Sequence, residues 1–441
     1  MRIRNRWVAV LLTAAMSLSV CACAEEKKEP TFTGEKTKEA EYQDYLNMIS
    51  PAVYGNVQGL ALEPGTYISI IGKSESAAYW KMLEKGVMQA AEDLNAALGY
   101  TGDDKIKVTY NAPADDENID EQVNILDEEL ARYPDVVGIA SVDEDACMVQ
   151  FDLATTNGIP IISLDSGNTY KGIQCVVKTD NEDAARTGAY KLADEIQEGS
   201  VLLLVQDSQS EAAREREESF VAQMKKEGTV NVAKVIYLDQ LEQVKEEIIA
   251  DKSEAEETTG DAVVEIVGET DASATEQVPS ENAVEKAETD STALEEETEK
   301  GQEQQEEQVY TEISQISDEE AIQYYMKKYE IKGIFGTNPE ATQLGLKAIE
   351  ALENVDEETE GQEDEIVLMG FDAGTDQITA LKEGKIKGLV VQNPFGIGYA
   401  SVIAAARTDL EIGNEAVVHT GYVWVTANNM EEESIQKMLY E

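Results

Sequence analysis

Hydrophobic and polar residues alternate in a regular pattern from Tyr67 onward. Short apolar runs such as residues 67–71 are typical of buried strands, whereas apolar residues at every third or fourth position indicate amphipathic helices. Residues 79–98 form the first such helical stretch, and the two kinds of segment then alternate along most of the chain. The predicted strands are 67–71, 106–110, 136–140, 160–164, 201–205, 232–237, 331–335, 366–370 and 389–392.

Strands that alternate with helices of this length imply parallel sheets covered by helices on both faces. Right-handed crossovers make each such sheet a doubly wound layer. About ten such units are too many for one sheet, and 441 residues are too many for one core. We therefore predict an α/β fold with two doubly wound parallel-sheet lobes. Lobe 1 comprises residues 66–179 and 393–422, and lobe 2 comprises 180–392 and 423–441. The chain would cross between them three times, near Thr179, Gln392 and Val423, and so form a hinge.

One segment breaks the alternation. Residues 251–310 contain 20 Asp and Glu but only three Lys, and they contain no aromatic residue before Tyr310. Such a stretch cannot bury enough apolar area to offset the entropy lost on ordering. We predict a disordered acidic insertion within lobe 2, although the composition of residues 280–308 also suits a helix. A second, smaller acidic insertion is expected at residues 356–364.

The N-terminal residues are typical of an export signal. Three arginines precede an apolar run, Trp7–Val20, that is too short to span a membrane as a helix. The sequence Val20-Cys21-Ala22-Cys23 then resembles a bacterial lipobox, in which Cys23 would become the lipidated N-terminus. We predict a lipoprotein signal peptide at residues 1–22 and a tether at 23–65. The alternative is an ordinary cleaved signal with two incidental cysteines.

Charge and composition narrow the function. With 89 acidic and 35 basic residues the formal net charge is −54, which disfavours nucleic acid and anionic lipid as partners. The electrostatic field of these charges has almost no effect on a neutral ligand. His419 is the only histidine, which strongly disfavours a Ser-His-Asp or Cys-His catalytic site. The number of histidines and cysteines also excludes a Cys₄ or Cys/His metal site, and we expect neither a metal nor a cofactor. Beyond the signal, Cys147 and Cys175 are expected to be free buried thiols, although export also permits a disulfide.

The candidate chemistry lies just after the predicted strands, where doubly wound sheets bind their ligands. Polar groups in these positions include Asp165, Asn338, Asp372 and Gln392, and a loop after Val205 leads to Arg214. Carboxylates, amides and a guanidinium can together bond the hydroxyls of a polyol, and aromatic rings can cover its C–H faces.

Several of these stretches occur together in a known family. They are Ser210–Arg216, Ile334–Asn338, Met369–Asp372 and Gln392–Gly398. In order and spacing the chain resembles the type I periplasmic sugar-binding proteins of the ribose/galactose-like group. The resemblance implies that Arg214, Asn338, Asp372 and Gln392 bind sugar hydroxyls, with Asp165 as the ligand from the first lobe. It further implies that Tyr79 and Trp80 stack on the sugar and that Phe371 packs against it.

The resemblance implies an extracytoplasmic solute-binding protein, held to the membrane only by its lipid anchor. It would capture a small neutral sugar or sugar-like polyol by hinge closure and deliver it to the permease of an ABC importer. We expect the protein to be a monomer. We also expect no enzymatic activity, because no environment for a general acid is visible around Asp165 and Asp372. The alternative is a ligand sensor that signals to a membrane kinase or chemoreceptor.

Five of the candidate residues also have a structural alternative. Arg214 could pair with an acidic residue of its own helix, and Asp372 or Asn338 could cap the helix that follows. Tyr79 and Trp80 could belong to the core. Lys73 and Glu75 are expected to be solvated.

Overall fold

The computed structural model of the chain describes residues 40–115, 117–264, 312–353 and 365–440, with only the backbone given for 254–264. The predicted signal peptide with Cys23 lies outside the described residues. So do residues 23–39 of the predicted tether, the insertion from residue 265 onward and the whole of the second insertion. The rest of the predicted tether, from residue 40, is described and packs on the fold, with Tyr54 and Leu62 buried. Among the helices that are described, none is both long and apolar enough to cross a membrane.

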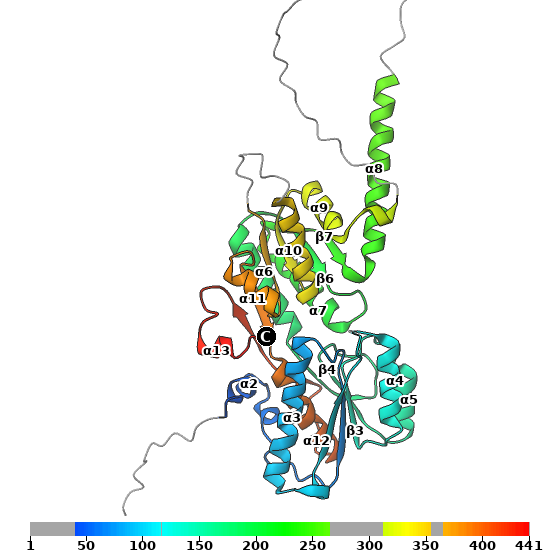
Figure 1. Ribbon diagram of the computed structural model, residues 1–441, viewed down its shortest axis with the longest axis vertical. Coiled ribbons are helices and arrows are strands. Elements are labelled where there is room, and N and C mark those ends of the chain that lie inside the picture. The colour runs from blue at the N-terminus through cyan, green and yellow to red at the C-terminus, as the bar shows by residue number, and fades with distance from the viewer. Residues whose placement is uncertain (1–39, 116, 265–311, 354–364, 441) are drawn as a thin grey trace, which may run out of the picture. The chain divides into compact units, whose positions relative to one another are not determined.

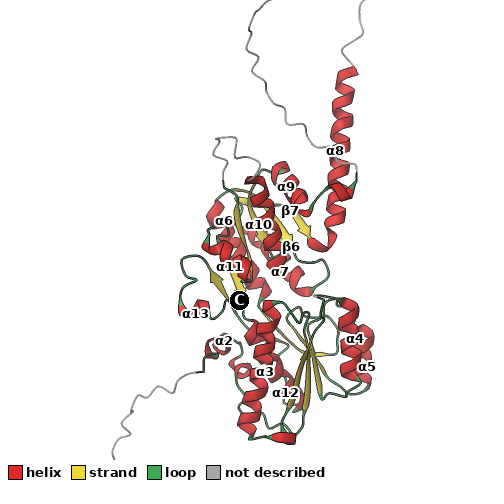
Figure 2. Cartoon of the chain, viewed as in Figure 1, coloured by secondary structure: helices red, strands yellow, loops and turns green. Residues whose placement is uncertain are grey.

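Two six-stranded sheets form the framework (Figures 1 and 2). The first has the strand order β11-β5-β4-β3-β1-β2, and all its pairings are parallel. Its strands are β1 (Tyr67–Ile71), β2 (Lys107–Asn111), β3 (Val136–Ile139), β4 (Ile161–Leu164), β5 (Ile173–Lys178) and β11 (Val417–His419). Burial of every residue of β1, β3 and β4 fits the continuous apolar runs read from the sequence.

The second sheet has the order β12-β10-β9-β8-β6-β7. Four of its pairings are parallel, and β12 adds an antiparallel edge beside β10. Its strands are β6 (Gly199–Val205), β7 (Val230–Tyr237), β8 (Ile331–Gly336), β9 (Val367–Phe371), β10 (Gly388–Gln392) and β12 (Tyr422–Val425). The predicted fold class, two α/β lobes with doubly wound sheets, is confirmed.

Helices cover both faces of each sheet. In lobe 2, neighbouring residues of β8 point to opposite faces. Phe335 packs against Phe220, while Ile334 lies against the opposite helix layer at Gly345. The helices around this sheet are α6 (Asn181–Ile196), α7 (Glu211–Glu227), α8 (Leu241–Val264), α9 (Asp318–Lys328), α10 (Pro339–Glu353) and α11 (Thr375–Lys382).

In lobe 1, α3 (Ala78–Leu98) and α12 (Pro394–Asp409) lie on one face of the sheet, and α4 (Ile119–Leu130) and α5 (Met148–Thr156) lie on the other (Figure 1). The backbones of α3 and α12 are unusually close. A Cβ at Gly86 would lie 2.0 Å from a carbonyl oxygen of α12, and one at Gly398 would lie 2.1 Å from a carbonyl oxygen of α3. Only glycine fits at both places. This close crossing fixes α3, whose first turn carries two of the candidate aromatic residues.

The chain passes between the two sheets three times. It leaves the first sheet after β5, and it leaves the second after β10 to form α12, which packs on the first sheet. It crosses again between β11 and β12, which begins at Tyr422, one residue before the predicted crossing.

The acidic segment differs from the prediction at its start. Residues 251–264, predicted to open a disordered insertion, continue α8. The helix is anchored by buried Val244 and Ile248, and the Asp251 carboxylate accepts a hydrogen bond of 2.7 Å from the Tyr324 hydroxyl. Its alanine, glutamate and lysine residues have high helix propensity, so an anchored helix extends easily through them.

Candidate ligand-binding site between the two sheets

A cavity of about 550 Å³ lies where the carboxyl ends of the two sets of strands meet. Both lobes and the C-terminal segment contribute to its walls. Six of the eight side chains predicted to contact a ligand line it: Tyr79, Trp80, Asp165, Asn338, Asp372 and Gln392. Arg214 and Phe371 do not belong to the lining. The predicted convergence of strand-end groups from both lobes is therefore observed for most of the set.

Asp165 and Asp372 occupy equivalent positions in the two lobes. Asp165 follows β4 and Asp372 follows β9, and both have left-handed backbone conformations, with φ of 57° and 70°. In each case the backbone N–H donates to the neighbouring strand, at 2.8 Å to Val177 and 2.7 Å to Val390. A non-glycine residue in this conformation costs about 1–3 kcal/mol, a strain that is common at functional sites. The conformation places both carboxylates at the cavity.

Asp372 is a buried carboxylate with few protein partners. Its side chain is 3% exposed, and Gln392 Nε2 donates to both of its oxygens at 3.0 and 3.1 Å. Burial raises the pKa of Asp372 above its usual value, although the nearby Arg216 guanidinium acts in the opposite direction. A carboxylate that is desolvated in this way gains most from new hydrogen-bond donors, such as ligand hydroxyls.

Tyr79 and Trp80 begin α3 beside Asp165. The Tyr79 hydroxyl donates to the Asp165 carboxylate, and the two aromatic rings meet edge to face with centroids 5.3 Å apart. Burial, together with the negative charges of Asp165 and Asp372, raises the pKa of Tyr79 well above its usual value. Its phenol is therefore neutral at physiological pH. Both rings line the cavity and present it with apolar surface.

The guanidinium of the cavity belongs to Arg216, two residues beyond the predicted Arg214. Arg216 is 5% exposed and donates to Asn181 Oδ1 at 2.9 Å, to the Thr337 carbonyl at 2.7 Å and to Gln392 Oε1 at 2.8 Å. Its guanidinium carbon lies 4.4 Å from the centre of the Phe371 ring. Phe371 is fully buried, and its ring packs against the guanidinium of Arg216.

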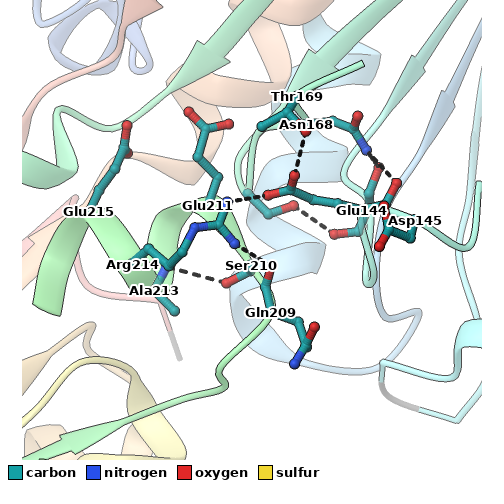
Figure 3. A network of polar contacts seen from close by, with 12 residues as sticks. Glu144, Asp145, Asn168, Thr169, Gln209, Ser210, Glu211, Ala213, Arg214 and Glu215 are labelled. Atoms are coloured by element: carbon teal, nitrogen blue, oxygen red, sulfur yellow. Dashed lines mark hydrogen bonds and ion pairs between the residues drawn. The ribbon is translucent and has the colours of Figure 1, made fainter. Parts of the chain in front are cut away.

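Arg214 lies at the rim, where it joins the two lobes (Figure 3). It donates to Glu144 of lobe 1 at 2.6 Å and to the Gln209 carbonyl at 2.7 Å, and its side chain is 42% exposed. Residues two apart on a helix point in nearly opposite directions, so α7 cannot direct both arginines into the cavity. The structure therefore does not place Arg214 where it could contact a sugar in the cavity, as the sequence analysis predicted. Its acidic partner is Glu144 of lobe 1 and not a residue of its own helix.

Further polar contacts join the lobes near Arg214. Lys178, at the end of β5, donates to Glu211 at 2.8 Å and to Glu215 at 2.6 Å. The Ala212 N–H donates to the Ser166 carbonyl at 3.2 Å. These contacts place the start of α7 against lobe 1 and thereby fix the direction in which Arg216 points.

Asn338 caps a helix and also lines the cavity. Its Oδ1 accepts from the Ala341 N–H at 2.8 Å and so caps α10, while Nδ2 donates to the Glu340 carboxylate. Asn338 lines the cavity, but its polar atoms already have protein partners.

Lys73 and Tyr440 are two of the lining residues, besides Arg216, that the sequence analysis did not predict. Lys73, expected to be solvated, is 3% exposed and lines the cavity, with its Nζ 3.8 Å from Glu117. It follows β1 by two residues, the kind of position that identified Asp165, so a signal was present. Tyr440, second from the C-terminus, lines the cavity although no local pattern indicates it. Glu75 is exposed, as expected.

Cys147 and Cys175 are both buried and free, in agreement with the expectation of two free thiols. Burial raises the pKa of Cys147 to about 11 and that of Cys175 to about 12, so both remain protonated at neutral pH. Within the described part of the chain, no group of three or more His, Cys, Asp or Glu side chains is placed to hold a metal ion.

Comparison with known proteins gives a family. The sequence profile of the periplasmic binding protein domain matches residues 68–265 and 247–408, which together span well over half of the chain. The two-lobed fold and the interlobe cavity define a binding protein of the periplasmic type. The chain belongs to the periplasmic binding protein domain family. A comparison with curated protein sequences finds no match.

Solved structures of similar fold include several solute-binding proteins. A carbohydrate transporter solute-binding protein from Agrobacterium radiobacter, in complex with D-arabinose, shares 22% identity at a TM-score of 0.58, covering 85% of this chain and 99% of that one. A protein from Agrobacterium vitis bound to α-D-tagatopyranose shares 19% at 0.59, with coverage of 85% and 99%. An arabinose-binding protein from Geobacillus stearothermophilus shares 19% at 0.56, with coverage of 83% and 99%. At these identities the likeness establishes the fold.

Proposed function

We propose that the protein captures a small neutral sugar or sugar-like polyol outside the cytoplasm and delivers it to the permease of an ABC importer. The observation that carries the proposal is the pair of carboxylates, Asp165 and Asp372, which reach one cavity from the two lobes beside aromatic rings. Solute-binding proteins of the same fold, crystallised with D-arabinose and D-tagatose, support this class of ligand.

Ligand binding would act through hinge closure. A sugar that bonds Asp165 of one lobe and Asp372 of the other favours the state in which the lobes are close, because its affinity for that state is greater. Removal of water from the cavity strengthens each hydrogen bond. The protein would act as a monomer, since one chain supplies both walls. The closed form would then dock on the permease, and no chemical change of the ligand is required.

A thermal-shift screen tests the ligand class. We expect at least one of D-arabinose, D-tagatose, D-fucose, D-glucose and D-galactose to stabilise the protein, by about 2.7 kcal/mol at a hundred times its Kd. A matched sugar acid, such as D-galacturonate beside D-galactose, is expected to bind less well, because its carboxylate would meet those of Asp165 and Asp372. Stabilisation by the acid, with no response to any neutral sugar, would reject the proposal.

We further propose that the mature protein is anchored to the membrane by lipid on Cys23. The support is the lipobox-like sequence after a short apolar run. In a bacterial host, wild-type protein is expected to partition into the membrane fraction and to incorporate labelled palmitate, whereas Cys23→Ser should do neither. Cys21→Ser is the matched control and should behave like the wild type. Equal labelling of wild type and Cys23→Ser would exclude lipidation at this residue.

A further inference from the structure

The C-terminal segment, residues 426–440, returns from the edge of the second sheet to the cavity. After β12 it forms the short helix α13 (Glu433–Gln436), which lies beside α2 (Gln43–Asn47) in Figure 1. Met430, Ile435 and Met438 are buried along the segment. The Tyr45 hydroxyl donates to the Lys437 carbonyl, and Lys437 Nζ lies 2.7 Å from the Asp44 carboxylate. The segment is therefore a packed part of the fold that holds its last residues in place.

Tyr440 is the residue that this segment delivers to the cavity. Its side chain is 3% exposed, and its ring meets Tyr79 edge to face with centroids 5.8 Å apart. Among the residues that the structure describes, none forms a hydrogen bond of good geometry with its buried hydroxyl, although the Asp372 carboxylate and the Ala373 backbone lie near it. Leaving a buried hydroxyl unpaired costs about 1–3 kcal/mol, so natural proteins rarely retain one without a use.

The surroundings of this hydroxyl define what it could bind. Burial, and then the nearby charge of Asp372, raise the pKa of Tyr440 well above its usual value, so the phenol keeps its proton and can donate it. Asp372 is close enough to act on the phenol, but the two groups do not form a hydrogen bond of good geometry. The free donor therefore lies next to a carboxylate that itself has room for a donor. A ligand hydroxyl can satisfy both, because it accepts from the phenol and donates to the carboxylate.

We propose that Tyr440 is a ligand-binding residue, which donates a hydrogen bond to the same sugar hydroxyl that binds Asp372, while its ring extends the aromatic wall begun by Tyr79. This inference rests on the proposed function. It makes the C-terminal segment a third wall of the site, besides the two lobes. A purely structural tyrosine would instead bury its ring and leave the affinity for sugar unchanged when its hydroxyl is removed.

The test compares Tyr440→Phe with Tyr399→Phe by calorimetric titration and thermal unfolding, using the sugar of the five-member panel that stabilises the wild type most. Tyr399 is also buried, but its hydroxyl donates to Asp93 at 2.9 Å, away from the cavity. Tyr440→Phe is expected to raise the Kd about three- to tenfold and to leave the Tm of the sugar-free protein unchanged or higher, because an unpaired hydroxyl is lost. Tyr399→Phe should lower the Tm and change the Kd by less than about twofold.

The outcomes separate this inference from the function on which it rests. If no panel sugar binds the wild type, the proposed function fails, and the inference fails with it. If a sugar binds the wild type and Tyr440→Phe with equal Kd, the function stands and the role of Tyr440 is rejected. A lower Tm of sugar-free Tyr440→Phe with an unchanged Kd would assign the hydroxyl to the stability of the fold and also reject the inference.

Discussion

Replacement of Asp372 by alanine is expected to abolish measurable sugar binding. The carboxylate is almost fully buried, and the Gln392 amide is its only hydrogen-bond donor of good geometry among the described residues. It can therefore accept from two adjacent sugar hydroxyls. Each hydrogen bond to a charged group contributes about 1.5–3 kcal/mol, so losing two should raise the Kd by roughly 100-fold or more. Titration calorimetry with the best panel sugar measures this directly, and a Kd within tenfold of the wild type would contradict the assignment.

The same residue links stability to pH in the sugar-free protein. Because burial raises the pKa of Asp372, the folded state holds this proton more tightly than the unfolded state. Its contribution to stability is therefore fully present below the unfolded pKa of about 3.9 and is lost as the pH rises through the higher folded value. Asp372→Asn, which carries no charge, should thus gain Tm relative to the wild type at pH 7 and lose this advantage near pH 4. If the Tm of Asp372→Asn exceeded that of the wild type by more at pH 4 than at pH 7, folding would lower the pKa of Asp372 and not raise it.

Arg216→Lys is expected to have the second largest effect. Lysine cannot reproduce the three hydrogen bonds to Asn181, Thr337 and Gln392, nor the contact of the planar guanidinium with Phe371. Buried acceptors would lose donors, at a cost of about 2–4 kcal/mol of unfolding free energy. Because Gln392 also holds Asp372, the Kd for sugar should rise at least roughly 30-fold.

Arg214→Lys is the matched control for Arg216→Lys, on the same helix. Its side chain is 42% exposed, and a lysine can still pair with Glu144, so both the stability and the Kd should change little, by about 1 kcal/mol or less. Chemical denaturation and titration of the two variants give the comparison. If Arg214→Lys weakened binding more than Arg216→Lys, the site would lie at the rim and not in the cavity.

The fold could be predicted because short stretches of the sequence are enough to identify most of its strands. Mostly apolar runs such as β1 and β4 identify buried parallel strands, and the polar residues that follow them mark the edge where ligands bind. Asp165 and Asp372 were found in this way. The strands that were missed, β5, β11 and β12, are only partly buried, and they lie towards the edges of their sheets, where sequence patterns are weak.

The assignment of the arginine depended on the rotation of a helix. Arg216 lies on the buried stripe of α7, together with Ala212 and Phe220, at helical spacing, whereas Arg214 lies off it. This spacing is present in the sequence and distinguishes the two residues, whereas the resemblance to the family implied Arg214. Tyr440 had no such signal. Its position depends on contacts of the C-terminal segment with residues near 45, almost the whole chain away.

A crystal structure grown with the sugar that stabilises the protein most is the most direct test of the central claim. The account predicts one sugar in the interlobe cavity, with hydroxyl oxygens within about 3.2 Å of both the Asp165 and Asp372 carboxylates. A sugar bound outside this cavity, or in contact with only one of these two aspartates, would contradict it.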